Sequence, residues 1–171
     1  TTGFLSDLSP DSRYFNEALI ESRKAIGRTC PNPPVGAIIV KDNKIVGRGF
    51  TGAIVGGSHA EVNAIADAGP NAEGATLYTT LEPCHHFGRT PPCTDAIIKA
   101  GIKCVVIGIK DPNPQINGSG IAILKKAGVE VILKDSDGLT EQLEAIISPF
   151  KKNILQNKPW VICKIATSID G

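Results

Sequence analysis

Short apolar, β-branched runs alternate with segments of helical periodicity, and this alternation restricts the folds open to the chain. The expected strands are 35–40, 45–50, 75–81, 104–109 and 129–133, and the expected helices are 9–26, 58–68, 93–100, 120–127 and 139–155. Strands that are joined through helices pair in parallel, in a sheet covered on both faces. The first two runs are separated by only a short polar turn, which adds an antiparallel hairpin. The pattern therefore predicts a three-layer α/β/α domain with a mixed sheet of about five strands.

Two further features of the sequence predict the ends of one helix and an additional strand. Ser58 is expected to cap the second helix, which Gly69 and Pro70 end. Residues 159–166 have the composition of an apolar strand that follows the last helix. We therefore expect a strand there, either at the edge of this sheet or at the entrance of another domain.

Composition narrows the classes of function. The 171 residues fit one compact domain, and the net charge of +1 gives no electrostatic argument for nucleic acid or an anionic membrane. No apolar run is long enough to span a bilayer, and the first residues show no basic region followed by an apolar stretch, so a secretory signal is not expected. Five cysteines are too few for a disulfide scaffold of this length. A cytoplasmic protein is expected, whose cysteines are thiols or metal ligands.

Three residues have the chemistry and placement of a metal site. His59 lies in the first turn of an expected helix, Cys84 follows a strand, and Cys93 begins the next helix. Imidazole and thiolate are ligands that zinc prefers. Three protein ligands leave a fourth position for water, which is the arrangement of a catalytic site. We therefore predict one zinc ion per chain at these residues.

Glu61 follows His59 by two residues and so cannot share its helix face as a fourth ligand. It can instead reach a metal-bound water and take its proton, as general acid–base catalysis requires. The competing interpretation is a buried structural pair of cysteines with a surface histidine. The combined order H-x-E, then P-C, then a second Cys at a helix start favours the metal site.

This order resembles the zinc deaminase signature, in which a metal-bound hydroxide attacks an amino-bearing ring carbon. The signature has a Cys-x-x-Cys spacing, whereas eight residues separate the two cysteines here. The segment 81–93 (LEPCHHFGRTPPC), with NPPVG at 32–36 and DPNP at 111–114, resembles the deaminase domain of the bifunctional riboflavin-biosynthesis deaminase/reductase family. The resemblance covers residues 12–171 and implies a cytidine-deaminase-like fold.

The resemblance implies a reaction and a set of site residues. The family hydrolytically deaminates 2,5-diamino-6-ribosylamino-4(3H)-pyrimidinone 5′-phosphate, a small-molecule intermediate of riboflavin biosynthesis, and releases ammonia. By motif match, His59, Cys84 and Cys93 hold zinc and Glu61 is the catalytic proton shuttle. The implied substrate-binding residues are Asn32, His86, Arg89, Asp111 and Asn113. Among these, His86 and Arg89 fall where the family contacts the phosphate, and Arg offers a bidentate fork; alternatively, both are solvated loop residues.

The resemblance also implies a domain organisation. Residues 1–155 correspond to the zinc-dependent deaminase domain, and 156–171 to a linker and the first strand of a truncated reductase-like domain. NADPH is expected only if a full reductase domain follows in the intact protein. The apolar segment 160–166 is a candidate contact for a second copy, so a homo-oligomer is left open.

Two other functions compete with this interpretation. One is a deaminase of cytosine, cytidine or a tRNA adenosine; the long loop and the reductase-like tail argue against it, and the near-neutral charge argues further against tRNA. The other is a non-catalytic zinc-binding module. Glu61 beside an open coordination position argues against that module, because a structural zinc site normally closes with a fourth Cys or His.

Overall fold

The computed structural model describes residues 10–53, 56–88, 90–114, 116–134 and 138–169. Within them, one five-stranded sheet has the order β2-β1-β3-β4-β5. The strands are β1 (Gly36–Lys41), β2 (Lys44–Phe50), β3 (Thr76–Leu81), β4 (Cys104–Ile109) and β5 (Glu130–Leu133). The helices are α1 (Pro10–Arg23), α2 (Ala60–Ala68), α3 (Cys93–Lys99), α4 (Ser119–Lys126) and α5 (Gly138–Gln156), with a 3₁₀ turn η1 at Gly69–Ala72.

The sheet is mixed, as predicted. β1 pairs antiparallel with both β2 and β3, whereas β3, β4 and β5 are parallel. The β1–β2 turn places Asp42 and Asn43 at φ values of 50° and 59°. This left-handed conformation suits the twist of a tight hairpin, and Asp and Asn tolerate it better than most residues.

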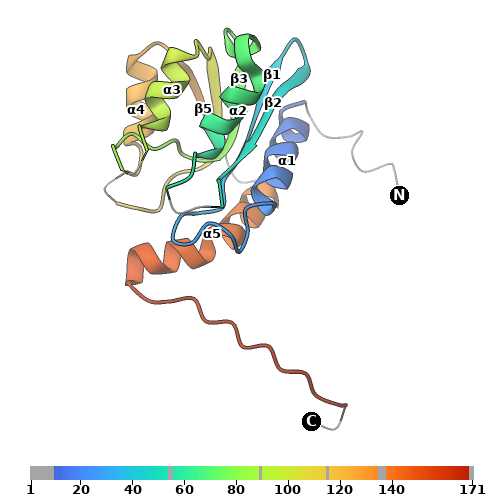
Figure 1. The fold of residues 1–171 in the computed structure, drawn as a ribbon. Coiled ribbons are helices and arrows are strands. Elements are labelled where there is room, and N and C mark those ends of the chain that lie inside the picture. Colours follow the sequence, from blue (N-terminus) through green and yellow to red (C-terminus); the bar gives the residue numbers. More distant parts are fainter. Residues whose placement is uncertain (1–9, 54–55, 89, 115, 135–137, 170–171) are drawn as a thin grey trace.

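Helices cover both faces of the sheet and complete the predicted three-layer α/β/α architecture. α1 and α5 contact one face, while α2, α3 and α4 follow one another along the other (Figure 1). The centre of the core is aliphatic and fully buried, with Ile38, Ile39, Leu77, Val105 and Ile107 at 0% exposure. Burying each such side chain stabilises the fold by about 1.5–3 kcal/mol.

Strand direction brings three connecting segments to one edge of the sheet. β2 and β3 each run opposite to β1, and β4 runs parallel to β3. The carboxyl ends of β2, β3 and β4 therefore share an edge. Segments 51–59, 82–92 and 110–118 leave the sheet there, which is the edge where open α/β sheets place ligand sites.

A close backbone approach sets the position of α2 on this sheet. A Cβ atom at Gly49 would lie 2.3 Å from the Ala60 carbonyl oxygen and 2.4 Å from the Ala64 nitrogen. Only glycine lets β2 and α2 pack this closely. The first turn of α2 is thereby held against the sheet edge.

Two sequence predictions about element boundaries were wrong. α1 ends at Arg23, and Ile26 is half exposed rather than part of the helix face. The N-cap of α2 is His59 instead of Ser58; its backbone is extended, with φ −73° and ψ 160°, and no side chain caps the helix.

Residues 159–166 form no edge strand of this sheet, which was one of the two alternatives; a strand at the entrance of another domain stays a prediction. Residues 157–169 form neither strand nor helix and are exposed. An apolar run becomes a strand only when a neighbouring strand accepts its backbone hydrogen bonds, and no described strand lies beside it. Among the described helices, none combines the length and apolar character that a membrane crossing requires.

Candidate functional site

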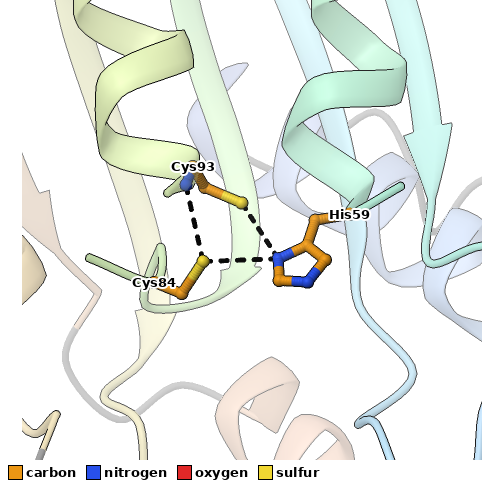
Figure 2. A group of neighbouring side chains, drawn as sticks. All are labelled: His59, Cys84 and Cys93. Carbon is orange, nitrogen blue, oxygen red and sulfur yellow. Dashed lines mark hydrogen bonds between the residues drawn. The ribbon is translucent and has the colours of Figure 1, made fainter. Parts of the chain in front are cut away.

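Three side chains from three elements converge at the carboxyl edge of the sheet (Figure 2). His59 is the N-cap of α2, Cys84 follows β3, and Cys93 is the first residue of α3. Their ligand atoms all lie within 4.8 Å of one another. His59 Nδ1 lies 3.1 Å from Cys93 Sγ and 3.4 Å from Cys84 Sγ. We refer to these three residues as the His–Cys–Cys group.

The His–Cys–Cys group fits a zinc ion in donor type and in spacing. Ligands of a tetrahedral zinc ion, bound at about 2.0–2.3 Å, lie roughly 3.3 to 3.8 Å apart. The observed separations of 3.1 and 3.4 Å are close to this range. One imidazole and two thiols are also the donors that select zinc over magnesium or calcium.

Hydrogen bonding favours the metal-binding form of one cysteine. A hydrogen bond from the Cys93 thiol lowers the pKa of Cys84, and the Cys93 backbone N–H also donates to the Cys84 sulfur at 3.4 Å. The hydrogen bond with Cys84 raises the pKa of His59. These hydrogen bonds favour the thiolate form of Cys84, which is the form that binds metal.

Glu61 lies beside the His–Cys–Cys group, in the first turn of α2. Its side chain is 4% exposed, and its Oε2 lies 3.6 Å from Cys93 Sγ. Burial raises the pKa of Glu61 to about 7. A carboxyl group with such a pKa can both accept and donate a proton near neutral pH.

A cavity of about 380 Å³ opens onto this edge. Its lining includes His59, Glu61 and Cys84, together with four of the five expected substrate-binding residues: Asn32, His86, Asp111 and Asn113. Cys93 is buried and does not line the cavity. The remaining expected residue, Arg89, lies outside the described residues. The structure therefore places residues from four separate segments of the sequence around one cavity.

Other residues of the cavity were missed by sequence reasoning. The lining also includes Phe150 and Ile154 of α5, Val35, Thr51, Glu82, Thr90 and Ile116. The amphipathic pattern of 139–155 predicts a helix with one apolar face. It does not show that the last turns of this helix extend past the sheet to the cavity.

A group of one imidazole and two thiols, with a buried carboxyl group beside it at an accessible cavity, places the molecule in the class of zinc-dependent deaminases. Residues 8–109 match the family described as the cytidine and deoxycytidylate deaminase zinc-binding region. The chain belongs to this family.

Two relatives are similar to this chain over nearly its whole length. The riboflavin biosynthesis protein RibD of Aquifex aeolicus is 48% identical over 161 residues, which are 94% of this chain and 44% of that protein. A RibD structure from Acinetobacter baumannii is 42% identical, with a TM-score of 0.85 over 95% of this chain and 45% of that one.

A structure from Thermotoga maritima is similar over almost the same region. It is described as a diaminohydroxyphosphoribosylaminopyrimidine deaminase/5-amino-6-(5-phosphoribosylamino)uracil reductase, with 42% identity and a TM-score of 0.79. The match covers 88% of this chain and 43% of that one. The chain thus spans less than half the length of each of these three relatives.

Proposed function

We propose that this domain hydrolytically deaminates 2,5-diamino-6-ribosylamino-4(3H)-pyrimidinone 5′-phosphate in riboflavin biosynthesis. The observation that carries the proposal is the buried Glu61 beside the His–Cys–Cys group, at a cavity that also receives His86 from the long loop between the cysteines. The names of the RibD relatives support the choice of substrate. The cavity of about 380 Å³ is within the size range of small-molecule sites.

His59, Cys84 and Cys93 would hold zinc. Zinc in such a site supplies a Lewis acid that activates water at neutral pH. The ligands must be two thiolates and a neutral imidazole, so protons leave the His–Cys–Cys group when metal binds. The lowered pKa of Cys84 makes the first of these deprotonations easier.

Glu61 is the proposed catalytic acid–base residue. Its carboxylate accepts a proton from the attacking water at Oε2 and delivers one to the departing amino nitrogen. The pKa of about 7, raised by burial, allows the same group to act in both directions. Its place in the first turn of α2, two residues after His59, fixes the carboxyl group relative to the metal ligand.

The substrate-binding residues surround the reacting position. Asn32 offers a donor and an acceptor to the ring or sugar, and Asp111 and Asn113 also line the cavity. His86 and Arg89 are assigned to the 5′-phosphate. The apolar side chains of Phe150 and Ile154 would cover the bound ring and exclude bulk water.

The intact protein is proposed to carry a reductase domain that uses NADPH. The support is the length of the relatives, of which this chain covers less than half, and the reductase in the description of the Thermotoga protein. We assign residues 1–155 to the deaminase domain and 156–171 to the connection and the first reductase strand. We further propose that the enzyme acts in the cytoplasm.

A substrate panel tests the proposed function. Zinc-loaded protein is assayed for ammonia release from the ribosylaminopyrimidine phosphate, from cytidine and from deoxycytidylate. Release from the first compound alone is the expected result. Release from cytidine or deoxycytidylate but not from the ribosylaminopyrimidine phosphate would overturn the proposal.

A further inference from the structure

Glu82 is a buried acid between the end of β3 and the segment that carries Cys84. Its side chain is 3% exposed. None of the salt bridges in the described part of the chain includes it. A buried carboxylate is tolerated only when hydrogen bonds replace its hydration, so its partners indicate its role.

Four backbone N–H groups donate to this one carboxylate. Oε1 accepts from Gly120 at 3.0 Å and from Ile121 at 3.3 Å. Oε2 accepts from Gly118 at 2.9 Å and from Asp111 at 3.2 Å. Each oxygen thus uses both of its acceptor positions on the backbone. Glu82 has no acceptor left for a substrate and must act through the segments that it holds.

One of these segments is the start of α4. The N-cap of this helix is Gly118, which provides no side-chain acceptor for the free N–H groups of the first turn. Glu82 supplies that acceptor from another element, and its negative charge suits a helix N-terminus. A Cβ atom at Gly120 would lie 2.2 Å from the Pro83 carbonyl oxygen. The absence of that atom lets α4 pack directly on the segment before Cys84.

The other segment is the cavity wall between β4 and α4. The buried Asp111 accepts a hydrogen bond from the Asn113 N–H at 2.8 Å, which shapes the turn. Asn113 and Ile116 then line the cavity. The Glu82 backbone N–H donates to the Ile109 carbonyl at 2.9 Å. The backbone of Glu82 is thus bonded to the end of β4, and its side chain to the cavity wall and to the start of α4. Glu82 therefore links the segment before Cys84 to both.

We propose that Glu82 is a positioning residue of the deaminase site, which fixes the wall of Asp111 and Asn113 relative to Cys84. The inference rests on the proposed function for its substrate. Loss of the carboxylate would loosen this wall and weaken substrate binding. None of the four hydrogen bonds is made by His59, Cys84 or Cys93, so metal would stay bound.

The test compares E82Q with E21Q in the zinc-loaded protein. A glutamine presents one oxygen and one NH₂ group, so two of the four N–H groups lose their acceptor. Glu21 is a matched control because it is 2% exposed and bonds to Lys24 and Arg48, away from the cavity. We expect E82Q to raise KM for the ribosylaminopyrimidine phosphate about tenfold and to change kcat less than about threefold. E21Q should lower stability and leave KM unchanged.

Amide hydrogen exchange provides a second readout that does not depend on turnover. E82Q should speed exchange at residues 111–121 at unchanged zinc content, whereas E21Q should not. If E82Q does not fold, E82D, which keeps the charge on a shorter side chain, replaces it in both measurements.

The outcomes separate this inference from the proposed function. Wild-type KM and exchange in E82Q would overturn the positioning role, as would loss of zinc or a fall in kcat at constant KM. If the wild-type protein releases no ammonia from this compound, the proposed function fails. The exchange measurement then decides alone: faster exchange at 111–121 supports the role of Glu82, and unchanged exchange overturns it.

Discussion

The hydroxyl group of Thr90 lies 3.3 Å from Nε2 of His59, the ring nitrogen that does not face the two sulfur atoms. A histidine that binds metal through Nδ1 must carry its proton on Nε2, and an acceptor there holds both the tautomer and the ring orientation. Thr90 belongs to the long loop between the cysteines, so this loop both carries His86 to the cavity and orients a metal ligand.

Replacing Thr90 by valine should weaken zinc binding. Valine keeps the shape but cannot accept the Nε2 hydrogen, and loss of such a partner costs about 10- to 100-fold in metal affinity. Thr90→Ser should bind zinc as the wild type does. Competition with a chromophoric chelator measures the affinity, and Thr140→Val in α5 is the control. Equal affinities in Thr90→Val and the wild type would contradict the assignment.

Glu61→Gln should separate metal binding from chemistry. The amide keeps the size of the side chain but cannot take a proton, so ammonia release should fall about 10²- to 10⁴-fold. Zinc content, measured by atomic absorption, should be unchanged, because Glu61 is not one of the three proposed ligands. Asp95→Asn in the first turn of α3 is the control. Full activity of Glu61→Gln would refute the role of Glu61 as proton shuttle.

Removing zinc should lower thermal stability. A ligand present at about a thousand times its Kd stabilises the folded state by about 4 kcal/mol. For a domain of this size, that free energy corresponds to a Tm difference of roughly 8 to 16 °C. Calorimetry with and without added zinc after chelation measures it, and His59→Ala should show no zinc-dependent shift. A His59→Ala variant that still responded to zinc would place the metal elsewhere.

Gly49→Ala should destabilise the fold and disturb the site together. The new methyl group would lie 2.3 Å from the Ala60 carbonyl oxygen, and crowding of this kind costs about 1–3 kcal/mol. Because α2 must shift to relieve it, zinc affinity should fall as well. Urea unfolding and chelator competition measure the two effects. Gly52→Ala is the control, since its Cβ would meet nothing closer than 3.4 Å; equal destabilisation by both changes would show that backbone contact is not the cause.

The fold was predictable because its signals are local. The strands at 35–40 and 104–109 are short apolar runs, and the helices between strands show clear periodicity. Residues 159–166 do not join this sheet, for the complementary reason. Composition describes what a segment prefers, but a strand also needs a partner, and residues 157–169 have none in the described chain.

The core of the candidate site could be predicted because its donors sit at recognisable places. His59 and Cys93 each stand where a helix begins, and Cys84 follows a strand. Glu82 and Thr90 could not be identified this way. Their partners are 29 to 39 and 31 residues away in sequence, so their contacts exist only once the sheet has formed. The contribution of Phe150 to the cavity likewise depends on where α5 crosses the sheet.

The shared direction of β2, β3 and β4 divides the molecule into two ends with different tolerance to change. The turns 41–44, 100–103 and 127–129 all lie at the end of the sheet opposite the cavity, and Ala127 and Gly128 are exposed. For protein engineering, the turn after α4 is therefore the natural place to attach a fluorophore, tether the enzyme to a surface or graft a second module while substrate access is kept free.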